Sequence, residues 1–320
     1  MDESCSGNFS MFRLINERAV VRVESVIIEG TYQVTDATPN SLMFTYAKNP
    51  LLLSMKRVSV TPKVFDSGPN SAFFVTYYYN EKTEFTGGDI RSLDMNTFEE
   101  EAYSGRFLLI DCLVSLGNKT VSYAIKENTN FSAISNMVNQ TNLVISRFDC
   151  FLYFTHAGAG ALTAIIAGDA NGTNITAEDL ALTVDAGNSL TNFGAFGVMN
   201  ASNFYMRNCS VVGRILGGTA AKSAFLVGET TNARNVTIRG VTFTSSSIAP
   251  SGTNGMLFGT FQANKSEYAL EVHDMSFYGC SAAGESKLFV SLIVSTQIWV
   301  ENITVDGYSG SGGHVLVNSA

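Results

Sequence analysis

The sequence predicts an all-β protein, a right-handed parallel β-helix in which short strands are wound into a solenoid. Three observations predict this fold class. A short motif recurs along the chain, its copies lie about 30 residues apart, and the apolar residues inside each copy alternate at the two-residue period of a strand.

The recurring motif is an Asn or Asp followed by an apolar residue, a small or polar residue and a second apolar residue. β-Branched residues are enriched within it, and a Gly often follows, which indicates a tight turn. Seven copies have their polar residue at Asp111, Asp149, Asp179, Asn208, Asn235, Asp274 and Asn302. Two earlier copies, with Val26 and Val58 at the apolar position, lack the Asn or Asp.

The spacing of these copies predicts the number of coils. Successive polar positions are 27 to 39 residues apart, which suits a solenoid with loops of varying length. The interval from Arg57 to Asp111 fits two turns, one of them degenerate. We therefore expect roughly ten coils with a period near 30 residues, in a single domain over 1–320. Residues 1–104 would form degenerate coils with excursions and 105–320 the regular coils.

The strands of successive coils should pair in parallel ~4.8 Å apart, so that equivalent residues stack. The Asn or Asp residues then form a structural turn column, because Asn tolerates unusual backbone angles and stacked Asn side chains form ladders. The apolar residue that follows each of them points inward. This alignment places Cys112, Cys150 and Cys209 in one internal column. A β-sandwich is the alternative fold, but its strands recur every 8–12 residues, roughly, without a fixed Asn position.

Composition narrows the classes of partner. The chain is 45% hydrophobic and only 15% charged, so it should fold with a surface rich in Ser, Thr, Asn and Gly. Its net charge of −8 argues against nucleic acid, which needs basic patches. The longest apolar stretch, 287–300, is shorter than the ~20 residues of a transmembrane helix, so we expect no membrane span within this chain. The acidic, polar start of the chain is not a signal peptide.

The repeated units resemble the pectin-lyase-like superfamily of right-handed β-helices, especially its non-enzymatic surface proteins built from repeats. The segments RNVTIRGVTF (234–243) and VENITVDGY (300–308) look most like it, and the similarity covers residues 105–320 well. Segments 261–264 and 312–315 come near the short motifs of polymorphic outer-membrane-type surface proteins.

Many members of that superfamily cleave polysaccharides, and the resemblance implies where catalytic groups would lie. Its hydrolases share an Asn-Thr-Asp segment, an Asp-Asp pair, a Gly-His and an Arg-x-Lys, of which this chain has only Gly313-His314. The stacked Asp residues of the turn column leave two functional readings open, catalysis by paired carboxylates and calcium binding. The exchange of Asn for Asp in that column favours hydrogen bonding instead. His156, His273 and His314 are too scattered for a metal site, so we expect no metal, no catalytic residue and no cofactor.

Five cysteines without a CxxC pair are too few for a disulfide scaffold or a zinc site. Cys112 and Cys150 are candidates for a disulfide, but buried free thiols that pack as small hydrophobes are favoured.

The pattern Asn-x-Ser/Thr occurs eleven times. Three matches, Asn208, Asn235 and Asn302, belong to the motif and are interpreted as turn residues. The remaining matches are candidates for N-glycosylation: Asn8, Asn118, Asn130, Asn139, Asn171, Asn174, Asn200 and Asn264.

Low charge, many glycosylation patterns and missing catalytic groups together favour a non-enzymatic protein of the extracellular space or cell surface. It would act as a stalk or an adhesin-like binding surface, with a glycan or a cell-surface protein as partner. The alternatives are a polysaccharide lyase or glycoside hydrolase of the same fold, and an intracellular or viral structural filament.

Overall fold

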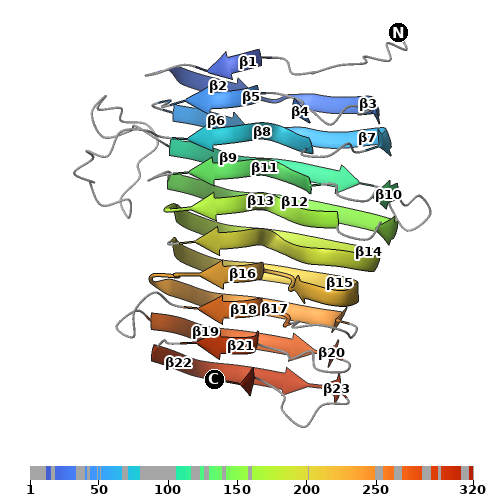
Figure 1. The fold of residues 1–320 in the computed structure, drawn as a ribbon, viewed down its shortest axis with the longest axis vertical. Helices are drawn as coiled ribbons and strands as arrows, with labels where there is room; N and C mark the ends of the chain where they lie inside the picture. Colours follow the sequence, from blue (N-terminus) through green and yellow to red (C-terminus); the bar gives the residue numbers. More distant parts are fainter. Residues whose placement is uncertain are drawn as a thin grey trace.

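The protein consists of β-strands stacked along one long axis (Figure 1). The structure, a computed structural model, describes residues 12–15, 19–33, 40–41, 44–48, 50, 52–66, 71–79, 106–116, 123–125, 130–138, 142–157, 161–200, 202–248, 255–262, 269–282, 290–294, 297–310 and 317–319. The regular elements within these ranges are all β-strands. None of the described residues forms a helix that could cross a membrane.

The strands are numbered in chain order. Residues before 160 contribute β1 (Phe12–Ile15), β2 (Val20–Glu24), β3 (Ile27–Gln33), β4 (Asn40–Ser41), β5 (Phe44–Lys48), β6 (Leu52–Lys56), β7 (Ser59–Asp66), β8 (Ser71–Tyr79), β9 (Arg106–Leu116), β10 (Tyr123–Ile125), β11 (Asn130–Val138) and β12 (Asn142–Ala157). Later residues contribute β13 (Ala161–Asn171), β14 (Asn174–Asn200), β15 (Asn203–Ser223), β16 (Val227–Thr231), β17 (Val236–Ile248), β18 (Phe258–Gln262), β19 (Ala269–Tyr278), β20 (Ser281–Ala282), β21 (Val290–Val294), β22 (Gln297–Asp306), β23 (Ser309–Gly310) and β24 (Val317–Ser319).

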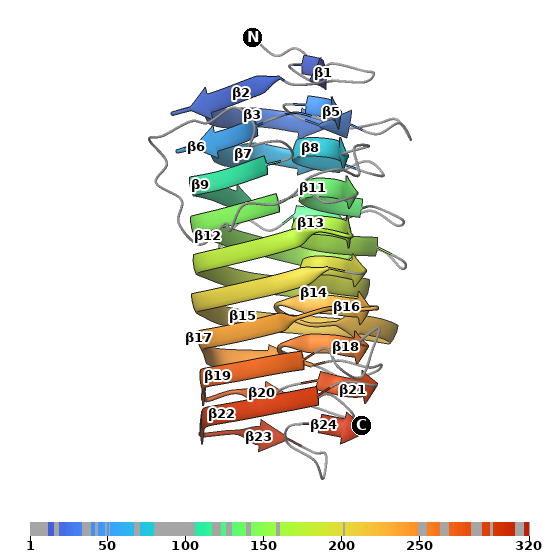
Figure 2. The same ribbon diagram turned by 90° about the vertical axis from the view of Figure 1, so that its left-hand side faces the viewer.

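The strands form three parallel stacks, which we call faces 1, 2 and 3 (Figures 1 and 2). Face 1 runs through β2, β6, β9, β12, β14, β15, β17, β19 and β22. Face 2 contains β3 and β7 and then the second halves of the long strands from β9 onward. Face 3 runs through β1, β5, β8, β11, β13, the end of β14, β16, β18, β21 and β24. The predicted parallel β-helix is confirmed.

Paired residues of adjacent coils lie close to 32 residues apart, slightly more than the period of 30 that the motif predicts. Asn142 pairs with Asn174, for example, at a separation of 32 residues. The interval from Arg57 to Asp111 was interpreted wrongly as two turns. Leu52 of β6 pairs directly with Arg106 of β9, so this interval is one turn with a long excursion. The expected total of roughly ten coils was therefore too high, because spacing alone cannot distinguish a long loop from a degenerate coil.

A residue with positive φ separates face 1 from face 2 in each coil. Asn208 in β15 has a φ of 53° and Gly240 in β17 has a φ of 64°. This left-handed conformation is reached most easily by Gly, Asn and Asp. It interrupts the alternation of the strand, so that Ile238 before Gly240 and Val241 after it both point inward and are buried.

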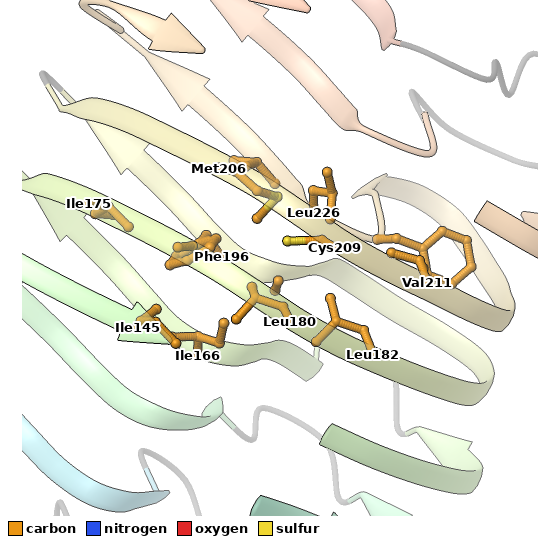
Figure 3. Close-up of a cluster of buried hydrophobic side chains, with 14 of the residues drawn as sticks. Ile145, Ile166, Ile175, Leu180, Leu182, Phe196, Met206, Cys209, Val211 and Leu226 are labelled. Atoms are coloured by element: carbon orange, nitrogen blue, oxygen red, sulfur yellow. The ribbon is translucent and has the colours of Figure 1, made fainter. Parts of the chain in front are cut away.

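Inward side chains of all three faces form one continuous core. Figure 3 shows its middle, where side chains from β12, β13, β14 and β15 meet Leu226, which lies directly before β16. The labelled residues are apolar and 3% or less exposed: Ile145, Ile166, Ile175, Leu180, Leu182, Phe196, Met206, Cys209, Val211 and Leu226. Each coil is too small to bury these residues alone, so the stack of coils is the stable unit.

Candidate functional site

The structure places five of the seven predicted turn residues in the left-handed turn between faces 1 and 2. They are Asp111, Asp179, Asn208, Asp274 and Asn302, with φ between 53° and 56°. The same column also holds Ser25 and Arg57, the residues before Val26 and Val58 in the two early copies, together with Arg147 and Gly240, which the motif did not reveal.

Asp149 lies outside this column. Phe148 pairs with Cys112, so Arg147 is the residue beside Asp111, and Asp149 is an exposed residue of face 2. The alignment of this copy was displaced by two residues. Because strand side chains alternate with a period of two, such a displacement leaves every inward residue pointing inward, and the pattern cannot reveal it.

The same displacement moves Cys150 out of the predicted internal column. Cys150 pairs with Val114 and Leu182, one inward position beyond the column that holds Cys112 and Cys209. All three thiols are buried, as the pattern predicts, but they do not share a single column.

Asn235 also lies elsewhere, directly before β17. Cys209 pairs with Val241, so Gly240 is the residue beside Asn208. A Cβ at Gly240 would lie 3.2 Å from the Asn208 Oδ1 atom. Since Gly adopts a positive φ without a side chain, the turn does not need an Asn in this coil.

The turn column is held by pairwise polar contacts along the stack. The Arg147 guanidinium donates a hydrogen bond to Asp111, which lowers the pKa of that carboxyl. Arg57 forms an ion pair with Glu24 at 3.1 Å, and the Asn302 side-chain amide donates to the Asp274 Oδ1 atom at 3.0 Å. Among the described residues, no group of three His, Cys, Asp or Glu side chains is placed to hold a metal ion.

Asparagine ladders form at a different corner, where face 3 ends and face 1 begins. In one ladder Asn203 donates to Asn174 at 2.7 Å, and Asn174 donates to Asn142 at 3.0 Å. In the other, Asn232 donates to Asn200 at 3.0 Å, and Asn200 to Asn171 at 3.3 Å. The predicted ladders therefore exist, in columns of which the recurring motif marked only Asn235, whose backbone N–H donates to the Asn203 Oδ1 atom at 3.3 Å.

These ladders account for three of the eleven Asn-x-Ser/Thr patterns. Asn171, Asn174 and Asn200, three of the predicted glycosylation sites, are ladder residues whose side-chain amides bond to neighbouring coils. Among the other candidates, only the backbone of Asn130, the first residue of β11, is described. The remaining candidates lie outside the described residues: Asn8, Asn118, Asn139 and Asn264.

The Ser or Thr of these patterns also has a structural role. Thr173 and Ser202, each 1% exposed, have their hydroxyl oxygens 3.1 Å apart, and the Thr173 backbone N–H donates to the Ser202 hydroxyl. We expect Ser202→Ala to lower the free energy of unfolding by about 1–3 kcal/mol, because a buried donor loses its acceptor. Urea denaturation measures the change. Ser210→Ala, at an exposed position of the following strand β15, is the control, and equal losses for both variants would contradict the role of Ser202.

The four described cysteines are free and buried. Burial raises the pKa of the Cys150 thiol well above its usual value and that of Cys209 to about 12. A raised pKa means that almost no thiolate exists at pH 8. We therefore expect Cys112, Cys150, Cys209 and Cys280 of a Cys5→Ser variant to react with a thiol reagent only after unfolding. Fewer than four reactive thiols in denaturant without reductant would instead indicate a disulfide.

His273 lies on face 1 between two carboxylates. Its Nδ1 atom is 3.3 Å from Glu301 and its Nε2 atom 3.9 Å from Glu271. The side chain of His156 and the Gly313-His314 pair lie outside the described part of the structure. The described residues therefore give no contact between the three histidine side chains.

Face 2 carries a surface feature that the sequence analysis missed. Residues Phe151, Thr183, Val212, Thr244 and Tyr278 pair in this order on five successive coils, and we call them the face-2 stripe. Phe151, Val212 and Tyr278 are exposed by 37%, 41% and 42%. Large apolar side chains thus alternate with threonines along the long axis of the molecule.

The stripe lies four residues beyond the left-handed turn in every coil. Its signal in the sequence is a fixed offset from the turn residue, as in Asn208 and Val212 or Asp274 and Tyr278. The recurring motif marks inward residues, and an alignment displaced by two residues at Asp149 matches Phe151 with the wrong neighbours. The signal becomes visible only in the correct register.

Two columns of mainly small or hydroxyl side chains flank the stripe. The first runs through Asp149, Ala181, Ser210, Thr242, Ser276 and Thr304, and the second through Tyr153, Asp185, Arg214, Ser247, Ser281 and Ser309. The nearest charges of opposite sign in the second column, Arg214 and Asp185, are paired at 2.6 Å. The surface is therefore rich in hydroxyl groups beside Thr244 and Tyr278, and its charged residues are Asp149, Asp306 and the Arg214–Asp185 pair. Neither the comparison with protein-family models nor the comparison with curated proteins found a match to this chain.

Proposed function

We propose that this chain is a non-enzymatic β-helix repeat protein of the extracellular space or cell surface, with an adhesin-like binding surface on its outer face. The observation that carries the proposal is the face-2 stripe, which presents three exposed apolar side chains in one row on a parallel sheet. A stack of paired strands holds these side chains at regular spacing, which limits the entropy lost on binding.

Two further observations support a binding role rather than a catalytic one. The Asp residues of the turn column are spread along the stack, and Asp111 forms an ion pair with Arg147. Hydrolysis of a glycosidic bond needs two carboxylates facing one substrate, a geometry that this column does not supply. The kinship with non-enzymatic members of the pectin-lyase-like superfamily is part of the same proposal and rests on the repeated units of residues 105–320.

The glycosylation patterns no longer argue for secretion, since the coil architecture explains several of them. The surface location rests instead on the low share of charged residues in the chain, 15%. Antibody labelling of intact and permeabilised source cells tests it directly. Staining of intact cells is expected, and staining only after permeabilisation would contradict the proposed location.

A cleavage assay separates the proposal from its enzymatic rival. The full chain is incubated with a panel of soluble polysaccharides, and new reducing ends and unsaturated products are measured. We expect no product from any of them, together with saturable binding of the chain to cells or immobilised glycans. Product formation that the purified chain catalyses would overturn the non-enzymatic function.

A further inference from the structure

We propose that the face-2 stripe binds a neutral, extended β-1,4-linked glycan that lies parallel to the long axis of the solenoid. This inference rests on the proposed function and names the ligand of its binding surface. The chain would hold the sugar by stacking on Phe151 and Tyr278 and by hydrogen bonds to the flanking hydroxyl groups.

The spacing of the stripe fits a polymer with a two-unit repeat. Neighbouring coils are ~4.8 Å apart, so Phe151, Val212 and Tyr278, which occupy every second coil, follow one another at about 10 Å. In an extended β-1,4-linked glycan each ring is turned by half a rotation from the one before, so every second ring presents the same face. One sugar ring advances about as far as one coil. Alternate rings can therefore meet successive apolar side chains.

The side chains along the stripe suit the two surfaces of a sugar ring. The axial C–H groups of a pyranose form an apolar face that packs against the electron-rich face of Tyr278 or Phe151. Its hydroxyl groups lie at the ring edge and need polar partners. Thr183 and Thr244 lie between the apolar side chains. Serine and threonine hydroxyls occupy the first column beside Val212, Thr244 and Tyr278, and the second column beside Thr244 and Tyr278. A few polar groups beside an apolar contact are typical of ligand sites.

Charge distribution argues for a neutral ligand. Asp149 and Asp306 are exposed near the two ends of the stripe, and Arg214, the described cation beside it, is already paired with Asp185. An anionic polysaccharide would meet these carboxylates without a free cation in the described part of face 2. A neutral chain avoids this repulsion.

The shape of the stripe favours a glycan over a protein partner. A stable protein interface buries roughly 800 Å² on each side and has a desolvated centre of clustered anchor residues. The exposed apolar side chains here form a single row, each separated from the next by a threonine. A linear polymer can contact every member of such a row, whereas a globular partner would leave most of them at its rim.

Titration calorimetry with the full chain tests the proposal. The probes are cellohexaose and chitohexaose, which are neutral and β-1,4-linked, maltohexaose, which is α-1,4-linked and curved, and an oligogalacturonate of similar length, which is acidic. The variants are Tyr278→Ala and Phe151→Ala, with Val212→Asp as a third that places a charge inside the stripe. Tyr205→Ala is the matched control, because Tyr205 is 36% exposed on face 1. Circular dichroism confirms that each variant is folded.

We expect at least one of the two neutral β-1,4-linked hexasaccharides to bind more tightly than maltohexaose and the oligogalacturonate. Each stripe variant should weaken that binding at least tenfold, and Tyr205→Ala should leave it unchanged. Absence of binding to both neutral probes, tighter binding of the acidic or curved probe, or equal binding by the stripe variants would overturn the ligand assignment. If the chain still binds cells and cleaves nothing, the proposed function stands while the assignment fails. Cleavage of a probe by the chain would instead contradict the proposed non-enzymatic function itself.

Discussion

Phe243→Ala is expected to lower the free energy of unfolding by about 3–5 kcal/mol, the range found for buried Phe truncation. Phe243 is fully buried and links three coils through its ring. It stacks on Phe277 of the next coil at 5.0 Å and meets Phe225 of the preceding coil edge-on at 6.0 Å. Truncation removes both ring contacts and leaves a cavity in a core that cannot collapse without moving paired strands.

Phe151→Ala is the matched control for this prediction, because it removes the same ring from an exposed position. We expect its effect to stay within about 0.5 kcal/mol. Urea denaturation followed both by circular dichroism and by fluorescence of the single tryptophan, Trp299, measures the two variants. Two probes are needed because stacked repeats can unfold in parts. Equal destabilisation by both variants would contradict the inward assignment of Phe243.

Gly213→Ala is expected to be still more disruptive and to prevent normal folding at elevated temperature. Gly213 has a φ of 134°, a region essentially restricted to Gly that costs about 1–3 kcal/mol when another residue is forced into it. A Cβ atom there would lie 1.7 Å from the Val184 carbonyl oxygen of the neighbouring coil. Because this oxygen belongs to the paired backbone, relief requires two coils to separate.

Gly279→Ala provides the comparison, since Gly279 has a φ of 59° and the nearest atom to a Cβ would be the Ser245 hydroxyl at 3.8 Å. This variant carries only the cost of a left-handed residue, about 1–2 kcal/mol. Thermal unfolding and soluble yield of the two variants are the measurements. A Gly213→Ala protein as stable as the Gly279→Ala protein would show that the close approach to Val184 does not exist.

Local patterns were sufficient for the fold and for the burial of individual residues. Leu180, Met275 and Cys209 were expected inside from alternation alone, and all three are buried. The predicted asparagine ladders are present as well, but between residues such as Asn174 and Asn203. This corner also has an Asn before a buried apolar residue, as Asn174 precedes Ile175, so the motif alone does not distinguish it from the turn between faces 1 and 2.

The candidate site could not be predicted in the same way. The face-2 stripe depends on which outward residue of one coil lies beside which residue of the next. Phe151 and Tyr278 are separated by more than a hundred residues in the sequence, and three pairings connect Phe151 to Thr244 before Tyr278 is reached. A displacement of two residues in one coil, as at Asp149, breaks this connection without disturbing the core pattern.

The amino-acid sequence alone determined that the chain forms parallel coils, because a strand with two inward apolar residues and a left-handed turn is a local property repeated many times. It also determined which side chains are buried, since alternation is a property of each strand. The tertiary structure alone decided the register between coils, the length of the coil that runs from β6 to β9, and the neighbours of each exposed residue. Register depends on the sum of many weak contacts between strands about 30 residues apart, and an outward side chain contributes little to that sum.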